Sequence, residues 1–365
     1  MATAQAEALN YPLGDTLPAP GKTLEVAPGV RWLRMPLPFA LDHINLWLLR
    51  DCIDGNEGWT IVDCGVATEA TRTLWTQIFE AELQGLPVLR VIVTHMHPDH
   101  LGLAHWLCER WTTPGGAATS LGAHECRLWI SATDWNAGRM GSKPGGFDGD
   151  GVARFYALHG LVDESALAQV RARGDYYPSL VPQVPARFRR LMDGMVLRIG
   201  GRDWFCITGY GHAPEHIGLH CPETATLIAG DMVLPRISTN VSVFYLEPEG
   251  NPLPLYLRSI AALRALPAAT LVLPSHGKPF HGLHTRITQL EQHHAERLAE
   301  VMLACAQAPQ SAAELLPLLF RRKLDLHQTT FAMGEAIAHL HLLAEDGRLV
   351  ATAGDDGVLR FRPAR

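Results

Sequence analysis

Residues 94–102 read THMHPDHLG, and the chain enters them from LPVLRVIV, a continuous run of mostly apolar and β-branched residues. Such a run predicts a short strand that is covered on both faces. Residues two apart on a strand point to the same side, so His95 and His97 can hold one metal ion. Asp99 and His100 begin the next turn and offer ligands to a second ion. Because imidazole and carboxylate suit zinc, iron or manganese better than calcium or magnesium, the stretch predicts a transition-metal site.

Three further candidate ligands each lie just after a stretch with the pattern of a strand. They are His212 in GYGHAPEH, Asp231 in LIAGDM and His276 in LPSHGK. Loops at strand ends meet on one rim of a sheet sandwich, so these side chains can join the first cluster. The alternative for each is a turn histidine or a solvated aspartate. His216 has the H-x-x-x-H spacing of a helical zinc protease with His212, but Pro214 disfavours a helix there. His216 is therefore expected to be a supporting residue or an ordinary strand residue.

The order of strand-like and helix-like stretches predicts an α/β domain with two β-rich halves. Residues 30–65 and 195–231 alternate short apolar runs with turn residues, and helical spacing follows the first half in VATEATRTLWTQIFEAEL. Residues 131–190 interrupt this order with a glycine-rich loop and helix-like segments, so we interpret them as a helical insertion. Helix-like stretches at 252–266 and 283–307 flank one more predicted strand, ATLVLPSHG.

The chain changes character at about Pro309. Two helix-like stretches, SAAELLPLLF and TTFAMGEAIAHLHLLAEDG, precede RLVATAGDDGVLRFRP, which has the pattern of a hairpin with a D-G turn. Helix, helix and hairpin are the order of a small winged-helix unit. We therefore expect a catalytic domain at 1–290, with the insertion at about 131–190, and a helical linker with a winged-helix-like domain at 291–365.

Charges within the tail are balanced between the two signs. Phosphate contacts need Lys or Arg, so a tail without a basic excess is a poor nucleic-acid reader. We expect it to pack or dimerise over the active site, with Ile337, Leu340 and Leu343 on one apolar helix face. The basic residues are Arg321, Arg322, Lys323, Arg348, Arg360, Arg362 and Arg365, and the acidic ones are Glu314, Asp325, Glu335, Glu345, Asp346, Asp355 and Asp356.

Composition limits the classes of protein further. A chain of 365 residues with 47% hydrophobic and 19% charged residues can bury a large core, and its net charge of −6 argues against a dedicated nucleic-acid binder. The first twenty residues lack the apolar run of a signal peptide, and nothing later resembles a spanning helix. The seven cysteines form no C-x-x-C pair. We therefore expect reduced thiols, no membrane contact and a cytoplasmic location.

These motifs carry a resemblance to a known family. HMHPDH at 95–100, followed by GH at 211–212, GD at 230–231 and SHG at 275–277, resembles the metallo-β-lactamase superfamily of hydrolases. The resemblance covers about residues 25–285 and implies an αββα sandwich. The tail resembles, more loosely, the small winged-helix domain that follows this fold in some members, among them single-strand RNA endonucleases.

The resemblance also implies a role for each candidate residue. Two divalent ions would be bound, with zinc expected first and iron or manganese as alternatives. Asp231 would bridge the ions, and Asp63, at the end of an early strand, would support the ligands from behind. The first ion would take His95, His97 and His212, and the second Asp99, His100 and His276.

A hydroxide that bridges two ions is the expected nucleophile, with Asp99 carrying the proton to the leaving group. The leading hypothesis is cleavage of a carboxylic ester, thioester or lactone in a small-molecule acyl substrate. A single-strand RNA endonuclease on the same site is the alternative, and a redox or non-catalytic role is a further one. A homodimer is left open. The substrate wall is expected in the insertion and after Asp231, among Trp135, Phe155, Tyr156, Tyr176, Tyr177, Arg236, Asn240 and Tyr245.

Overall fold

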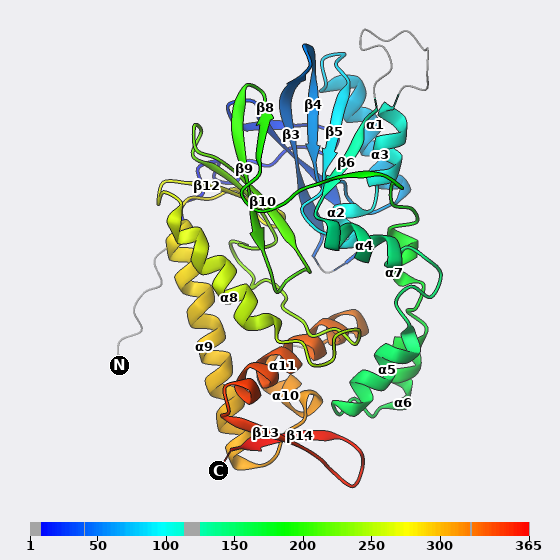
Figure 1. Cartoon of the computed structure of the whole chain (residues 1–365), viewed down its shortest axis with the longest axis vertical. Helices are drawn as coiled ribbons and strands as arrows, with labels where there is room; N and C mark the ends of the chain where they lie inside the picture. The colour runs from blue at the N-terminus through cyan, green and yellow to red at the C-terminus, as the bar shows by residue number, and fades with distance from the viewer. Residues whose placement is uncertain (1–8, 40, 113–124, 322, 365) are drawn as a thin grey trace.

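Two β-sheets packed face to face form the centre of the molecule (Figure 1). The computed structural model describes residues 9–39, 41–112, 125–321 and 323–364. The first sheet has seven strands in chain order: β1 (Leu24–Ala27), β2 (Val30–Pro36), β3 (His43–Ile53), β4 (Asn56–Val62), β5 (Val88–Ile92), β6 (Arg127–Ile130) and β7 (Phe188–Arg190). The second has the order β12-β11-β10-β9-β8, made of β8 (Val196–Ile199), β9 (Arg202–Gly209), β10 (His216–Cys221), β11 (Thr226–Gly230) and β12 (Leu271–Pro274).

Helices cover the outer face of each sheet. The first sheet packs against α1 (Glu69–Ala81) and α3 (Ala104–Trp111), and the second against α8 (Pro252–Ala262) and α9 (Leu283–Gln307). Alternation along β2 explains the layering, because Trp32 faces the opposite sheet while Leu33 and Met35 face the helices. The molecule is therefore an αββα sandwich, as the sequence predicts.

Most predicted strands are confirmed within a few residues of their expected ends. The sequence analysis does not predict β1, β6 and β7, each of which has only three or four residues. β7 lies at the end of the predicted insertion and pairs in parallel with β6. Its two arginines are exposed, so its sequence lacks the apolar alternation that identifies a strand.

The insertion is helical and spans the distance between the sandwich and the tail (Figure 1). It contains α4 (Ala132–Gly141), α5 (Gly149–Leu158), α6 (Glu164–Arg171) and α7 (Tyr176–Leu180). Phe155 and Tyr156 of α5 are buried in the same hydrophobic cluster as the tail, and the Tyr156 hydroxyl donates to the carbonyl of Thr330 at 2.9 Å. Two residues expected in the substrate wall are thus core residues.

The tail has the predicted order of helix, helix and hairpin. Its elements are α10 (Ala312–Leu319), α11 (Leu326–Glu345), β13 (Leu349–Ala353) and β14 (Leu359–Pro363). Ser311 and Asp325 each start a helix with a capping box. Ile337, Leu340 and Leu343 are fully buried against the chain's own helices, so this face is not free for a second chain. The winged-helix class and the division at residue 290 stay predictions; α9 runs without a break across that position.

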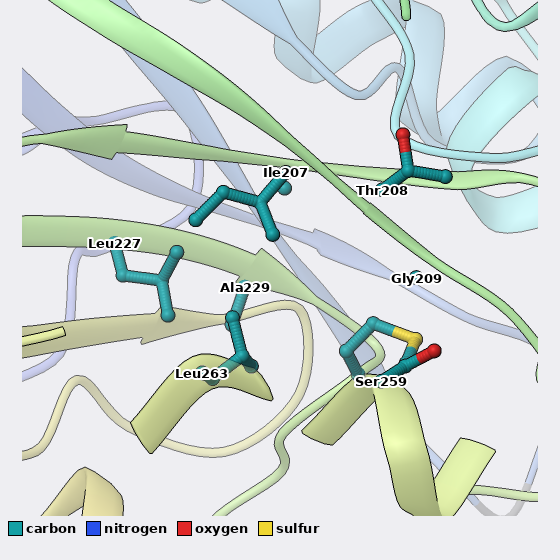
Figure 2. Close-up of a pocket in the computed structure, with 9 residues that line it drawn as sticks. Ile207, Thr208, Gly209, Leu227, Ala229, Ser259 and Leu263 are labelled. Atoms are coloured by element: carbon teal, nitrogen blue, oxygen red, sulfur yellow. The ribbon is translucent and has the colours of Figure 1, made fainter. Parts of the chain in front are cut away.

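A small packing void lies between the second sheet and α8. Figure 2 shows Leu227 and Ala229 of β11 facing Leu263 beside Ile207, Gly209 and Ser259. The void has a volume of about 10 Å³, which is enough for about one water molecule. It is therefore a packing defect and no ligand site.

Two further observations concern the chain as a whole. No helix in the described ranges combines the length and apolar character needed to cross a membrane. All seven cysteines are free thiols, and only Cys52 is exposed.

Leu340→Ala should lower the free energy of unfolding by about 2–5 kcal/mol, because the truncation leaves a cavity in the core that joins tail and sandwich. Chemical denaturation of the purified variant measures the change. Leu303→Ala on α9, where the side chain is 64% exposed, should change the value by about 0.5 kcal/mol or less. Equal effects of the two substitutions would contradict the shared core.

Candidate metal centre

All seven predicted ligands meet at one rim of the sandwich. Each of them follows a strand. Loops at the ends of neighbouring strands converge, and this brings the side chains together. His95 and His97 lie between β5 and α2 (Pro98–Leu101), and Asp99 and His100 lie in the first turn of α2. The remaining three follow strands of the second sheet: His212 after β9, Asp231 after β11 and His276 after β12.

The side chains form two adjacent groups. His95, His97, His212 and Asp231 make the first group and Asp99, His100 and His276 the second, and within each group the ligand atoms lie within 4.8 Å of one another. In the first group, Nε2 of His95 lies 2.9 Å from Nδ1 of His97 and 3.2 Å from Nε2 of His212.

Asp231 lies between the two groups. Its Oδ2 is 3.3 Å from Nε2 of His212, and its Oδ1 is 3.6 Å from Nε2 of His100 and 3.5 Å from Nε2 of His276. One carboxylate thus faces both groups with different oxygens, the arrangement that a bridging ligand needs. The bridging role stays a prediction.

The nitrogen and oxygen atoms that face the centre are suited to bind a cation. Nε2 of His100 and Oδ1 of Asp231 are buried and have no hydrogen-bond partner. A buried polar atom without a partner is costly, so in native proteins such atoms usually face a water, an ion or a ligand. The set of five imidazoles and two carboxylates is the chemistry that transition ions prefer.

Hydrogen bonds at the outer nitrogen of His212, His276 and His100 hold the inner nitrogen of each of these rings toward the centre. Nδ1 of His212 donates to the carbonyl of Asn240 at 2.7 Å, and Nδ1 of His276 donates to the carbonyl of His43 at 2.8 Å. Nδ1 of His100 donates to Oδ2 of Asp63 at 2.8 Å. These bonds fix the tautomers that leave Nε2 free as a ligand.

Asp63 occupies the position expected from the sequence. Its backbone has a φ of 63°, the left-handed region that aspartate tolerates better than most residues. The turn directs its carboxylate to His100 and to Thr94, whose backbone N–H donates to Oδ1 at 2.8 Å. Thr94 in turn contacts Nδ1 of His95 at 3.0 Å, so one aspartate orients rings from both groups.

His216 begins β10 and lies behind the first group. Its Nε2 accepts a hydrogen bond from the backbone N–H of Asp231 at 3.2 Å. This approach requires Gly230, because a Cβ at that position would lie 2.1 Å from Nε2 of His216. The G-D pair is therefore needed in that order: the glycine admits the ring and the aspartate faces the centre.

Asp134, which no sequence pattern singles out, holds the loop between His95 and His97. Its buried carboxylate accepts from the backbone N–H of Met96 at 2.8 Å and from that of Glu215 at 2.8 Å. The hydroxyl of Tyr177 donates to the carbonyl of the same Met96. Burial raises the pKa of Asp134 to about 6.

The two groups differ electrostatically. Burial, together with the neighbouring His212, lowers the pKa of His97 to about 3, so this ring is neutral and ready to bind a cation. Burial also acts on His276, but Asp231 and Asp99 outweigh it and raise its pKa to about 10. A metal ion in the second group would therefore displace the proton that His276 otherwise carries beside these carboxylates.

A cavity of about 520 Å³ opens onto both groups. Its walls include His97, Asp99, His212, Asp231 and His276 on one side and residues of α10 and α11 on the other. Of the eight residues expected in the substrate wall, Tyr176 and Asn240 line the cavity, and the other six do not. Trp135 stacks on Phe188, and Tyr245 accepts a hydrogen bond from the backbone of Asp148. The aromatic residues that the sequence suggested for the substrate wall thus more often pack against other parts of the protein than line the cavity.

Two adjacent His/Asp groups at one rim of an αββα sandwich are typical of a metal-binding protein, and comparison with known proteins gives the family. The profile of the metallo-beta-lactamase superfamily matches residues 40–276, and that of the metallo-beta-lactamase-like C-terminal domain matches residues 298–364. The chain belongs to the metallo-β-lactamase superfamily. Family and cluster together make it a metal-dependent hydrolase.

Similar proteins cover nearly the whole chain. A beta-lactamase domain protein from Burkholderia ambifaria is 57% identical, with 98% of each chain covered and a TM-score of 0.90. A metallo-beta-lactamase family protein from Thermus thermophilus is 27% identical, with 92% of this chain and 99% of that chain covered and a TM-score of 0.72. A Bacillus subtilis (strain 168) protein named "Probable metallo-hydrolase YqjP" is 24% identical over 324 residues, 85% of this chain and 91% of that protein.

Elemental analysis of protein purified without chelator should find close to two equivalents of transition metal per chain. Asp231→Ala should reduce both the metal content and the turnover, because it removes the carboxylate that faces both groups. His105→Ala on α3 is the matched control, since among the described residues that ring pairs with Glu109 and lies outside both ligand groups. His293 is unsuitable as a control because it lines the cavity. Normal metal content and turnover in Asp231→Ala would show that the bridge is misassigned.

Proposed function

We propose that the protein hydrolyses a carboxylic ester, thioester or lactone with an apolar acyl group, at a site that holds two divalent ions. The observation that carries this proposal is the wall of the cavity beside the two ligand groups. A volume of about 520 Å³ falls within the range of roughly 300–1,000 Å³ that is typical of small-molecule sites.

Apolar side chains from four parts of the chain contribute to that wall. Leu37, Phe39 and Leu41 come from the loop before β3, and Leu180 comes from α7. Such walls bind substrate by removing apolar surface from water, roughly in proportion to the area covered. The remaining apolar residues are Leu234 and Ile237 after β11 and Leu319, Phe320, Leu324, Phe331 and Ala332 in the tail.

Divalent ions in the two groups would supply Lewis acidity and a nucleophilic hydroxide near neutral pH. The protein's own part is to orient the ligands and to move a proton. Asp99 fits the second task, because its carboxylate lies at the cavity wall, 3.4 Å from Nε2 of His276. Asp99 can therefore pass a proton to a leaving oxygen or sulfur while it also serves as a ligand. Zinc is the ion that we propose first, with iron and manganese as alternatives.

A single-strand RNA endonuclease is the second candidate. Phosphate binding needs cationic side chains. Arg297 is the one lysine or arginine among the described residues that line the cavity. Arg321 and Lys323 are exposed, and Arg322 lies outside the described residues. The charges at the site thus favour an acyl substrate over RNA.

Purified protein should hydrolyse p-nitrophenyl esters, acyl-CoA thioesters or lactones, and a chelator should abolish this activity. Single-stranded RNA should show no measurable affinity at physiological salt, and Arg321→Ala/Arg322→Ala/Lys323→Ala should keep the acyl hydrolysis. The measurements are initial rates on the substrate panel and a binding titration with labelled RNA. Tight, salt-sensitive RNA binding with metal-dependent cleavage would reverse the order of the two candidates.

The apolar wall should be visible as a preference for acyl length. Phe331→Ala should lower kcat/KM for a hexanoyl ester relative to an acetyl ester by about tenfold, because truncation removes apolar contact from the cavity mouth. Phe244→Ala is the matched control, since that ring is similarly exposed but does not line the cavity. An unchanged ratio in Phe331→Ala would place the acyl group elsewhere.

A further inference from the structure

The chain between β11 and α8, residues 231–251, contains no helix or strand, yet it passes directly beside the first ligand group. The carbonyl of Asn240 in this connection accepts the hydrogen bond from Nδ1 of His212. The hydroxyl of Thr239 donates to the carbonyl of Asp231. Because no sheet ladder holds this connection, whatever fixes it also fixes the orientation of His212.

Two helices that follow the connection in sequence hold it. The buried Arg286 of α9 donates to the carbonyls of Leu234 at 2.6 Å and Ile237 at 2.8 Å. These bonds secure the first part of the connection. The part that carries Asn240 lies along α11 of the tail.

Side-chain and backbone bonds join this second part to α11. Nδ2 of Asn240 donates to Oε2 of Glu335 at 3.3 Å and to the carbonyl of Phe331 at 3.4 Å. The hydroxyl of Ser242 donates to Oδ1 of Asn240 at 2.7 Å, so both ends of the amide are engaged. The backbone N–H of Val243 donates to the carbonyl of Gly334 at 3.2 Å.

The fit between the two segments is close. A Cβ at Gly334 would lie 2.6 Å from Cβ of Ser242. Thr239, Val241, Ser242 and Val243 are all buried, which leaves the connection little room to move. The path from the tail to the ligand therefore consists of short, directional contacts: Glu335 to Asn240, and Asn240 to His212.

We propose that Asn240 and Glu335 are positioning residues for His212, and that α11 thereby sets the affinity of the first ligand group for its ion. The tail has this role in addition to forming part of the cavity wall. Hydrogen bonds to the outer nitrogen of a ligating histidine change metal affinity by about 10- to 100-fold when they are disrupted. The inference rests on metal binding by the cluster, and it is independent of the substrate.

The test is a titration of metal-free protein with Co²⁺ in competition with a chelator. Visible absorption measures the bound Co²⁺. The titration is carried out on the wild type and four variants. Asn240→Ala should weaken binding to the first group by about tenfold and change the second group less. Glu335→Leu should act in the same direction. Glu335→Gln should restore most of the affinity, because its amide oxygen still accepts from Asn240.

Glu345→Gln is the matched control, since it removes the same charge at the far end of α11, where the side chain contacts Asn251. It should bind both ions as the wild type does. Thermal melting of each metal-free variant separates loss of affinity from loss of folding. If Asn240→Ala does not fold, the pair Glu335→Leu and Glu335→Gln makes the same comparison.

Wild-type affinity at both groups in folded Asn240→Ala or Glu335→Leu would overturn the inference. Equal losses of Co²⁺ affinity in Glu335→Leu and Glu335→Gln would also overturn it. The affinity would then not depend on whether residue 335 offers an oxygen that accepts from Asn240. A wild-type protein that binds no Co²⁺ would instead refute the proposed function.

Discussion

Seven imidazole and carboxylate side chains share one small, largely buried volume, and the rest of the structure is arranged around the cost of placing them there. The outer nitrogens of His95, His100, His212 and His276 contact Thr94, Asp63 and the carbonyls of Asn240 and His43. Their inner atoms remain directed at one another. A cation between them would offset the repulsion among the clustered rings and the cost of burying them, so the arrangement is suited to binding metal ions.

That requirement explains several local choices in the backbone. Asp63 adopts a left-handed conformation at the end of β4, and Gly230 makes room for His216 directly before Asp231. Neither of these two backbone features stabilises a strand or a turn by itself. Both place a side chain where the centre needs it, which is typical of backbone strain at functional sites.

Much of the fold and of the centre could be predicted from the sequence, because the signals are local. Alternation within 30–65 and 195–231 marks the strands, and the HMHPDH motif places four ligands within six residues. Even the distant ligands His212, Asp231 and His276 follow recognisable strands. Loops at strand ends converge, which made their meeting plausible, and the resemblance to the superfamily assigned each of them to a group.

The parts that could not be predicted depend on contacts without a local pattern. Backbone carbonyls orient two ligating rings, and a carbonyl has no signature in the sequence. Asp134 resembles any aspartate in the first turn of a helix, where its carboxylate accepts a hydrogen bond from the hydroxyl of the N-cap residue Ser131 at 3.0 Å. The cavity wall combines α10 and α11 with loops of the sandwich, and only the tertiary structure shows which apolar residues face inward.

The unbroken course of α9 from Leu283 to Gln307 has a consequence for how the protein matures during synthesis. His276 is the last of the seven ligands along the chain, so a nascent polypeptide carries every metal-binding side chain before α9 has emerged. The helix that supports Asn240 and closes the cavity emerges later still. The hydrogen bonds that hold Asn240 to Phe331 and Glu335 can therefore form only after all seven candidate ligands have been synthesised.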